Sequence, residues 1–305
     1  MYRSLGLVGA ALLASLSSAQ ASAARPGMAE MDCTVRMTAT PTAWTIQGFD
    51  PFGDVAPEAT FSITYVNDGD KDCRFSPAFE LDQPPFGLSS GSGQRIGYVL
   101  LDLTDSQDVT PRAGRSVRTT LQREIVLKAN QSRTILYKLA VDADKVRDAG
   151  TFSQNVIVEA RDAAFRTYGG TRLTLGIDVL PSARIGLAGA FTMNDGQAVV
   201  ELGELRQGVA PVPLQLRVSS TGRYDLAVSS ANSGKLRMDS TQWSVPYSLA
   251  IGGQSVNLAG TAPVTGPAGH GYRRESLPIQ FIIGDVSNRR AGVYSDIISI
   301  SVSAR

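Results

Sequence analysis

Residues 291–302, AGVYSDIISISV, give the clearest indication of the fold. From Ile298 onward apolar and polar residues alternate, which is the period-2 pattern of a half-buried β-strand. Residues 149–158, AGTFSQNVIV, align with residues 291–300 without a gap, and the apolar parity continues, because Ala160 corresponds to Val302. We therefore expect a duplicated β unit, in which each copy has an Ala-Gly turn, an aromatic residue and a strand.

The flanking sequence extends the repeat and indicates the fold class. Upstream of the two copies, residues 139–141 (LAV) correspond to residues 281–283 (FII). Short alternating runs separated by Gly, Pro, Asn and Asp occur at 61–66, 124–127, 135–141, 173–179 and 214–218. Helical periodicity is limited to one short turn at 142–147. Many short strands with turn residues between them predict an all-β chain of sandwich domains.

The repeat also places a domain boundary near Pro181-Ser182, with one domain at 33–180 and a second at 182–305. In the first domain the chain continues past its Ala-Gly strand into another strand-like segment, residues 172–180. In the second domain the sequence reaches Arg305 on the Ala-Gly strand itself. We therefore expect the second sandwich to lack its last strand.

The N-terminal residues predict export. Arg3 precedes an apolar run at residues 5–16, and two A-x-A patterns follow at 19–21 and 21–23. This order is typical of a signal peptide, here residues 1–23. The apolar run is shorter than the about 20 residues that a membrane-spanning helix needs. We expect an exported protein and no integral membrane protein.

Only two cysteines are present, Cys33 and Cys73. In an exported protein such a pair predicts a disulfide, because two cysteines allow only one connectivity. Closing the loop between them would stabilise the fold by about 3–4 kcal/mol on the chain-entropy model. A metal site at these thiols is disfavoured, because no further His or Cys lies near either one.

Charge and residue types argue against nucleic-acid binding and against catalysis. Lys and Arg number 29 and Asp and Glu number 28, so the chain has no bulk attraction for nucleic acid. The sole histidine, His270, lies in a stretch rich in Gly and Pro, and no G-x-S-x-G motif precedes it. We expect a loop histidine, no enzyme, no cofactor and no metal.

The C-terminal half resembles the spore coat protein U-like domains of archaic chaperone–usher pili. The resemblance covers about 120 residues and rests on 291–302, with weaker support from 200–205 (VELGEL), 216–220, 224–230 and 245–249. This half has no cysteine, whereas many such domains carry a disulfide.

The resemblance implies an immunoglobulin-like, pilin-type antiparallel β-sandwich that lacks its last strand. It also implies three partners: a periplasmic chaperone, an outer-membrane usher, and an adjacent pilus subunit that supplies the absent strand. Tyr294, Ile298, Ile300 and Val302 would then form the strand-acceptor edge.

The segment at 24–32 bears on the position in a pilus. It contains Pro and Gly and no alternating apolar run, so it would make a poor donor strand. A subunit that accepts a strand and donates none sits at the tip. We therefore expect a two-domain tip adhesin, whose first domain binds an unidentified surface ligand.

Two loops of the first domain are candidate adhesive loops, because they place aromatic rings among Pro and Gly. Their side chains are Phe49, Phe52, Pro85 and Phe86. In the alternative, these rings pack back onto the sandwich. Two other functions stay open: an internal two-domain structural pilin, and a secreted carbohydrate-binding or carbohydrate-active sandwich.

Overall fold

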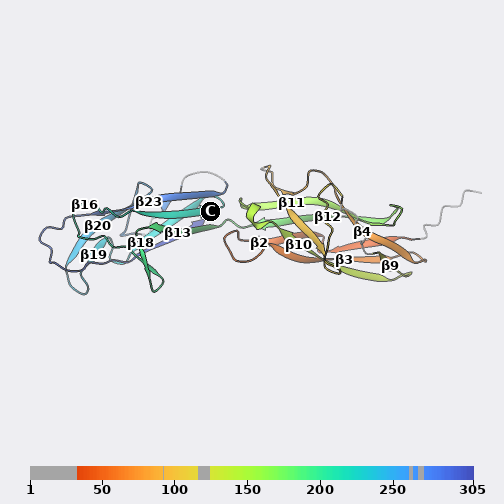
Figure 1. Cartoon of the computed structure of the whole chain (residues 1–305), viewed down its shortest axis with the longest axis horizontal. Coiled ribbons are helices and arrows are strands. Elements are labelled where there is room, and N and C mark those ends of the chain that lie inside the picture. Colours follow the sequence, from red (N-terminus) through yellow and green to blue (C-terminus); the bar gives the residue numbers. More distant parts are fainter. Residues whose placement is uncertain (1–32, 92, 116–123, 261–263, 267–270) are drawn as a thin grey trace, which may run out of the picture.

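The computed structural model describes residues 33–91, 93–115, 124–260, 264–266 and 271–305. The predicted signal peptide, the segment 24–32 and His270 lie outside these residues. The described chain consists of strands and one 3₁₀ turn, Ala143–Lys145, so the all-β prediction is confirmed. Figure 1 shows two sandwiches that lie end to end, with the C-terminus close to their junction. No helix in the described part of the chain is both long and apolar enough to cross a bilayer.

The first sandwich has two sheets, ordered β1-β3-β10-β7-β8 and β2-β12-β11-β4-β9, and β5 joins β11 to β6. Its strands are β1 (Val35–Thr40), β2 (Ala43–Phe49), β3 (Glu58–Asn67), β4 (Cys73–Leu81), β5 (Leu88–Ser89), β6 (Arg95–Ile96), β7 (Tyr98–Asp102), β8 (Gln107–Asp108), β9 (Ile125–Leu127), β10 (Ser132–Val141), β11 (Gly150–Arg161) and β12 (Thr167–Val179).

Alternation along the strands builds the first core. In β10, Ile135, Tyr137 and Leu139 are buried, while the residues between them face outward or lie at the margin. Between the sheets the Trp44 ring stacks on Phe61, with a centroid distance of 5.3 Å. Large aromatic and β-branched side chains on one face of each sheet exclude water from the space between the sheets.

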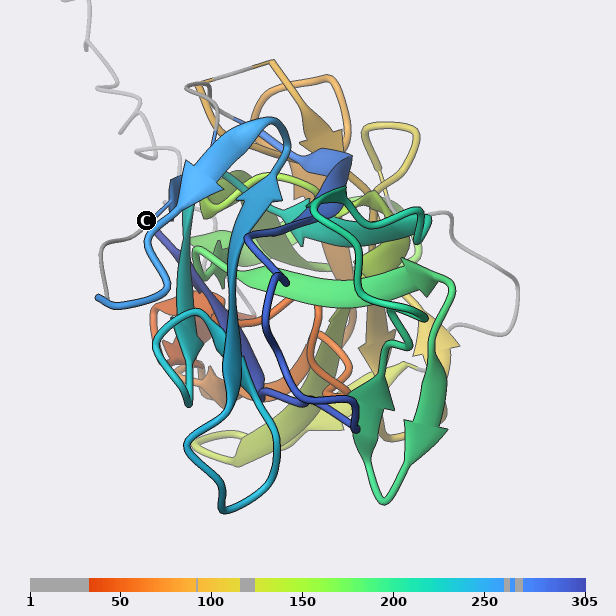
Figure 2. The same ribbon diagram turned by 90° about the vertical axis from the view of Figure 1, so that its left-hand side faces the viewer.

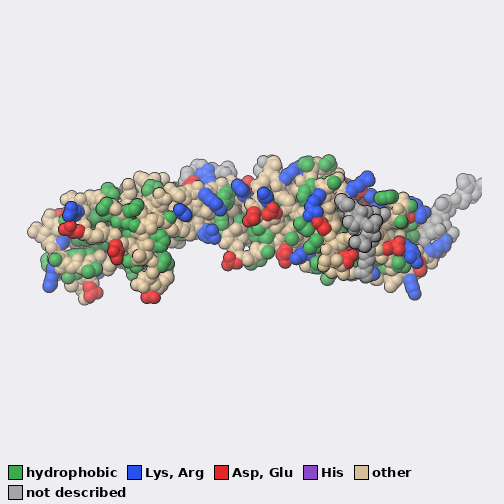
Figure 3. All heavy atoms as spheres, viewed as in Figure 1, with side chains coloured by type: hydrophobic (Ala, Val, Ile, Leu, Met, Phe, Trp, Pro, Cys, Tyr) green, Lys and Arg blue, Asp and Glu red, His purple; other side chains and the backbone are tan. Residues whose placement is uncertain are grey.

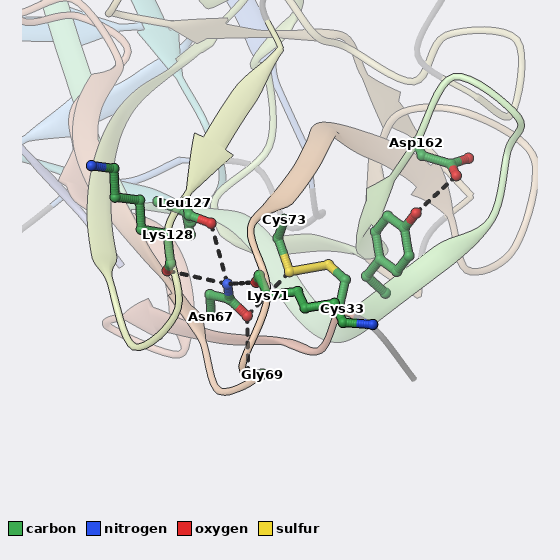
Figure 4. Close-up of a disulfide and its surroundings, with 9 residues drawn as sticks. Cys33, Asn67, Gly69, Lys71, Cys73, Leu127, Lys128 and Asp162 are labelled. Atoms are coloured by element: carbon green, nitrogen blue, oxygen red, sulfur yellow. Dashed lines mark hydrogen bonds between the residues drawn. A yellow bond between two sulfur atoms is a disulfide. The ribbon is translucent and has the colours of Figure 1, made fainter. Parts of the chain in front are cut away.

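The predicted disulfide is confirmed, because Cys33 and Cys73 are bonded at one end of this core. Beside it, the buried Asn67 amide organises the turn that precedes Cys73 (Figure 4). The Asn67 Nδ2 donates to the carbonyls of Lys71 (2.7 Å), Leu127 (3.2 Å) and Lys128 (3.1 Å), and its Oδ1 accepts from Gly69 N (3.0 Å). One side chain thus ties the β3–β4 turn to the end of β9.

The second sandwich has one sheet ordered β13-β17-β23-β20-β19, which β16 and β21 extend, and one ordered β22-β18-β24. Its strands are β13 (Ala183–Gly189), β14 (Thr192–Asn194), β15 (Gln197–Val199), β16 (Gly208–Val209), β17 (Leu214–Ser220), β18 (Tyr224–Ser230), β19 (Lys235–Arg237), β20 (Ser244–Ile251), β21 (Gln254–Val256), β22 (Val264–Thr265), β23 (Arg273–Ile283) and β24 (Ile298–Ala304). The β14–β15 hairpin projects away from this sandwich (Figure 2).

Seven strands of the first sandwich have counterparts in the second, as the sequence repeat predicts. The order β1-β3-β10-β7 matches β13-β17-β23-β20, and the order β11-β4-β9 matches β24-β18-β22. Even a local detail is shared, because Ser153 bridges to Ser89 and its counterpart Ser295 bridges to Arg237. Among the described residues, β12 of the first sandwich has no counterpart in the second.

One close backbone approach fixes the path of β12. Gly169 lies so near β1 that a Cβ atom there would overlap the carbonyl oxygen of Val35. The neighbouring Gly170 has room, since its nearest atom would be Glu159 Cγ at 3.4 Å. Gly169 therefore allows β12 to pass over β1 at the start of the strand.

We predict that Gly169→Ala lowers the free energy of unfolding of the first sandwich by about 2 kcal/mol or more, because backbone must move to admit the methyl group. Gly170→Ala is the matched control and should change it by less than about 0.5 kcal/mol, as at sites where a substitution disturbs no packing. Urea denaturation measures both variants. Equal stability of the two variants would contradict the close approach.

Candidate functional site: an unpaired strand edge

In the first sandwich, β12 covers the second edge of β11. The two strands pair antiparallel from Gly150–Val179 to Arg161–Thr167, and β12 pairs in parallel with β2 on its other side. Four side chains of β12 point into the core and are buried: Leu173, Leu175, Ile177 and Val179. This strand therefore satisfies backbone groups on two neighbours and closes the apolar interior on that side.

In the second sandwich the corresponding edge is unpaired. β24 pairs antiparallel with β18, from Tyr224–Ala304 to Ser230–Ile298, and no strand of the described chain pairs with its other edge. β13 forms the margin of the facing sheet and pairs with β17. Cα atoms of β13 and β24 approach within 8 Å, yet no ladder joins the two strands. We call this side of the second sandwich, formed by β13 and β24, the open edge.

Burial differs in the same way between the two copies of the repeat. In β11, Val156, Val158 and Ala160 are 0% exposed. Their counterparts Ile298, Ile300 and Val302 are half-buried, although they pack against the second core. The difference has a simple cause, since no strand among the described residues covers β24 in the way that β12 covers β11.

The facing strand shows the same contrast. The inward residues of β13 are half-buried, whereas those of β1 are buried; the sets are Ala183, Ile185 and Leu187 in β13, and Val35, Met37 and Ala39 in β1. The open edge thus combines unpaired backbone groups with a strip of incompletely covered apolar side chains. Such an edge is a template for a further strand.

The predicted acceptor residues lie together on this edge. Tyr294, Ile298, Ile300 and Val302 are all half-buried and contact the second core. The Tyr294 hydroxyl donates to the carbonyl of Arg290 at 2.7 Å, which holds the segment that leads into β24. That these residues accept a strand stays a prediction.

Sequence reasoning did not single out Asp296, which lies between Tyr294 and Ile298. Its Oδ2 accepts from Ser230 Oγ (2.5 Å) and Tyr247 Oη (2.7 Å), and its Oδ1 accepts from the backbone N–H groups of Asn232 (3.0 Å) and Ile297 (2.8 Å). Burial, and then the hydrogen bond to Asp296, raise the pKa of Tyr247, so this hydroxyl stays protonated and donates. The one signal in the sequence is an acidic residue in an otherwise apolar alternation.

The four side chains of the candidate adhesive loops are mostly turned onto the protein. Phe49 is buried in the first core. Phe52 is half-buried and faces the second sandwich, with its ring 6.5 Å from that of Tyr272. Phe86 is half-buried against Tyr98, with a centroid distance of 4.7 Å. Of the four, Pro85 is exposed. The placement favours the alternative in which the rings pack back, and adhesion through these loops stays a prediction.

A different aromatic side chain is exposed at the far end of the first sandwich. The hairpin between β11 and β12 turns at residues 162–166, on the side away from the second sandwich (Figure 1). At its tip, Phe165 is 67% exposed and has a φ of 65°, a conformation that non-glycine residues rarely adopt. An aromatic residue in a five-residue loop between two alternating runs was the signal that the sequence offered.

Asp162 holds this tip. Its carboxylate accepts from the backbone N–H groups of Ala164 and Arg166, from Arg166 Nε (2.7 Å) and from the Tyr168 hydroxyl (2.9 Å; Figure 4). Burial opposes ionisation, but these hydrogen bonds and the Arg166 charge lower the pKa of Asp162 to about 2. The carboxylate is therefore ionised at neutral pH and presents Phe165 on a fixed turn.

A metal site finds no support in the residues that the structure describes. They contain no group of three or more His, Cys, Asp or Glu side chains that could hold a metal ion. On the face in Figure 3, basic and acidic side chains are interspersed, in keeping with the net charge of +1.

The open edge predicts a difference between two matched substitutions. Val158→Ala should lower the free energy of unfolding of the first sandwich by about 2 kcal/mol, because the side chain is fully buried. Val302→Ala should lower that of the second by less than about 1 kcal/mol, because part of its surface already meets water.

Amide hydrogen exchange reports each sandwich separately and can measure both changes. A cost for Val302→Ala as large as that for Val158→Ala would show that the edge of β24 is covered in solution.

Comparisons with known proteins found solved structures only, since no family model and no curated protein matches the chain. One is a CsuC–CsuE chaperone–tip adhesion subunit complex from archaic Csu pili of Acinetobacter baumannii, with 12% identity, TM-score 0.46, and coverage of 88% of this chain and 99% of that chain. Another is the CupB6 tip adhesin of Pseudomonas aeruginosa, with 10% identity, TM-score 0.36, and 89% and 95% coverage. A third is CfaE, the adhesive subunit of CFA/I fimbria of enterotoxigenic Escherichia coli, with 12% identity, TM-score 0.33, and 86% and 92% coverage. At these TM-scores, arguments for function rest on the geometry of the chain itself.

Proposed function

We propose that this chain is a subunit of a chaperone–usher pilus and that its second domain, residues 182–305, accepts a β-strand from another protein. The observation that carries the proposal is the open edge, where half-buried apolar side chains lie beside the edge of β24 that pairs with no strand of the described chain. β-Strand addition of this kind gains affinity from main-chain hydrogen bonds and specificity from alternate side chains.

The first domain, residues 33–180, supplies a template for the accepted segment. β12 fills the corresponding place there with apolar residues at alternate positions: Leu173, Leu175, Ile177 and Val179. The occupant of the open edge is therefore an extended segment with apolar residues at every second position. It runs antiparallel to β24, as β12 runs antiparallel to β11.

The direction of the accepted strand determines on which side of the second sandwich the rest of the partner lies. β24 runs toward the junction of the two sandwiches, where the C-terminus lies (Figure 1). An antiparallel strand runs away from the junction, so the residues that follow it leave at the far end of the second sandwich. If the partner subunit lies at that end, the first sandwich, with Phe165 at its tip, points away from the partner. This arrangement suits a tip subunit whose first domain touches the target surface.

The remaining parts of the proposal follow from the resemblance. The signal peptide, residues 1–23, directs export, and a periplasmic chaperone covers the open edge until an adjacent subunit replaces it during passage through an outer-membrane usher. The protein then acts at the cell surface, through contact and without catalysis. An apolar ring on a rigid turn loses little conformational entropy on contact, so Phe165 is the proposed adhesive anchor.

Strand acceptance predicts that the missing strand stabilises the second sandwich when it is supplied. We would append a copy of residues 169–179 after Arg305 through a four-residue turn. The added strand should raise the free energy of unfolding of this sandwich by about 3 kcal/mol or more, because several apolar side chains become covered.

The control carries the same extension with Leu173, Leu175, Ile177 and Val179 of the copy replaced by Ser. Urea denaturation compares the two proteins. If the Ser control stabilised the sandwich as much as the apolar strand does, the acceptor role would be wrong.

The adhesive role is tested at Phe165. Phe165→Asn removes the apolar ring but suits the positive φ. It should reduce retention of the protein on polystyrene at least about threefold, the effect expected of losing one exposed apolar anchor. Leu136→Asn, at a side chain that is 50% exposed on β10, is the control and should leave retention unchanged. If both variants reduced retention equally, Phe165 would not be the adhesive anchor.

A further inference from the structure

The apolar strip of the open edge is interrupted at Asp296. Tyr294, Asp296 and Ile298 follow one another on the inward side of the segment that leads into β24, and all three are half-buried. Their counterparts in the first sandwich are Phe152, Gln154 and Val156. Both sandwiches therefore carry a polar residue at this place, but the second one carries a charge.

In the first sandwich the polar residue is neutral and satisfied. Gln154 Oε1 accepts from Gly87 N at 3.1 Å, and its Nε2 donates to Pro85 O at 2.9 Å. The residue of β12 that pairs with Gln154 is Leu175, which is fully buried. A leucine is accommodated there because the amide next to it carries no charge and has its hydrogen bonds.

In the second sandwich the hydrogen-bond partners of the Asp296 carboxylate within the described chain are all neutral donors, namely two hydroxyls and two backbone N–H groups. No Lys or Arg of the described chain forms an ion pair with it. Arg237, on the neighbouring β19, instead donates from Nη2 to Thr241 O at 3.4 Å. The carboxylate of Asp296 thus has hydrogen-bond donors but no neutralising cation, and because the residue is only half-buried, part of it is accessible to water.

An accepted strand removes that hydration. A carboxylate that loses water without gaining a positive charge is strongly disfavoured. A leucine opposite Asp296, in the place of Leu175, would impose this cost. A basic residue would remove it, because directly opposed side chains on antiparallel strands have Cβ atoms about 4.5–5.5 Å apart and opposite charges there attract.

We propose that the strand accepted at the open edge carries Lys or Arg opposite Asp296, with apolar residues at the inward positions on either side. This inference rests on the proposed acceptor function and adds the chemistry of the partner. It also fixes the register. A slip of two residues keeps the same face inward but sets the basic residue against Ile298 or Tyr294.

Asp296 also has a structural role, because its carboxylate accepts from Asn232 N and so fixes the turn after β18. Gln154 fixes residues 85–87 in a similar way through its amide. An asparagine at 296 keeps the oxygen that accepts from Asn232 and removes the charge. Preference for a partner's charge therefore separates the proposed role from the structural one.

The experiment uses the full chain and three synthetic peptides based on residues 169–179. One has the natural Leu175, one carries Leu175→Lys and one carries Leu175→Glu. With the wild-type chain, the Lys peptide should bind about fivefold tighter than the Leu peptide, the size of a good cross-strand charge pair. The Glu peptide should bind most weakly. Fluorescence anisotropy of labelled peptides gives the dissociation constants.

With Asp296→Asn, the preference for Lys over Leu should disappear. If the Leu peptide bound the wild-type chain as tightly as the Lys peptide, the inference would be overturned while strand acceptance stood. If no peptide bound, both the inference about the basic residue and the proposed strand acceptance would be contradicted. Should Asp296→Asn not fold, the Lys, Leu, Glu order on the wild-type chain still decides the question.

Discussion

A β-strand has two edges, and the structure of this protein depends on what pairs with the second edge of its repeated strand. In the first sandwich, β12 pairs with β11 along twelve residue positions of β11 and buries its own alternate side chains. In the second sandwich, β24 has one paired edge, and its apolar side chains stay half-covered. Uncovered apolar surface is unfavourable in water, and a row of unpaired backbone groups is a template for pairing, so the open edge can accept a partner strand.

Because the β unit is duplicated, each residue of the second sandwich can be compared with its counterpart in the first. β11 and β24 are aligned copies with the same apolar alternation, and each pairs with a corresponding strand, β4 or β18, so the difference in their burial reflects the covering strand. Val158 and Ile300 hold equivalent places, yet only Val158 is fully buried. Gln154 and Asp296 hold another equivalent pair, and there the difference lies in charge. The first comparison indicates that a strand is accepted, and the second indicates what that strand carries.

The loops at the two ends of the first sandwich place their aromatic rings differently. At the far end of the first sandwich, the ionised Asp162 carboxylate fixes the loop that presents Phe165. At the junction, Phe52 contacts the ring of Tyr272, and Arg184 of β13 lies over the Phe52 ring at 5.8 Å. Phe52, in a loop with Pro and Gly, thus contacts the second sandwich, whereas Phe165, in a hairpin loop without Pro or Gly, is exposed to solvent.

The all-β fold, the pairing of Cys33 with Cys73 and the correspondence of 149–158 with 291–300 could be predicted from the sequence. Period-2 alternation, an isolated cysteine pair and internal repetition are local or composition-level signals. The sequence also pointed to Tyr294, Ile298, Ile300 and Val302 as members of one strip. The packing of the folded chain was needed to show that Phe49 is buried, that Phe165 is exposed, and that Asp296 lies within the strip among neutral donors. Exposure and hydrogen-bond partners depend on elements far away along the chain, which no local pattern encodes.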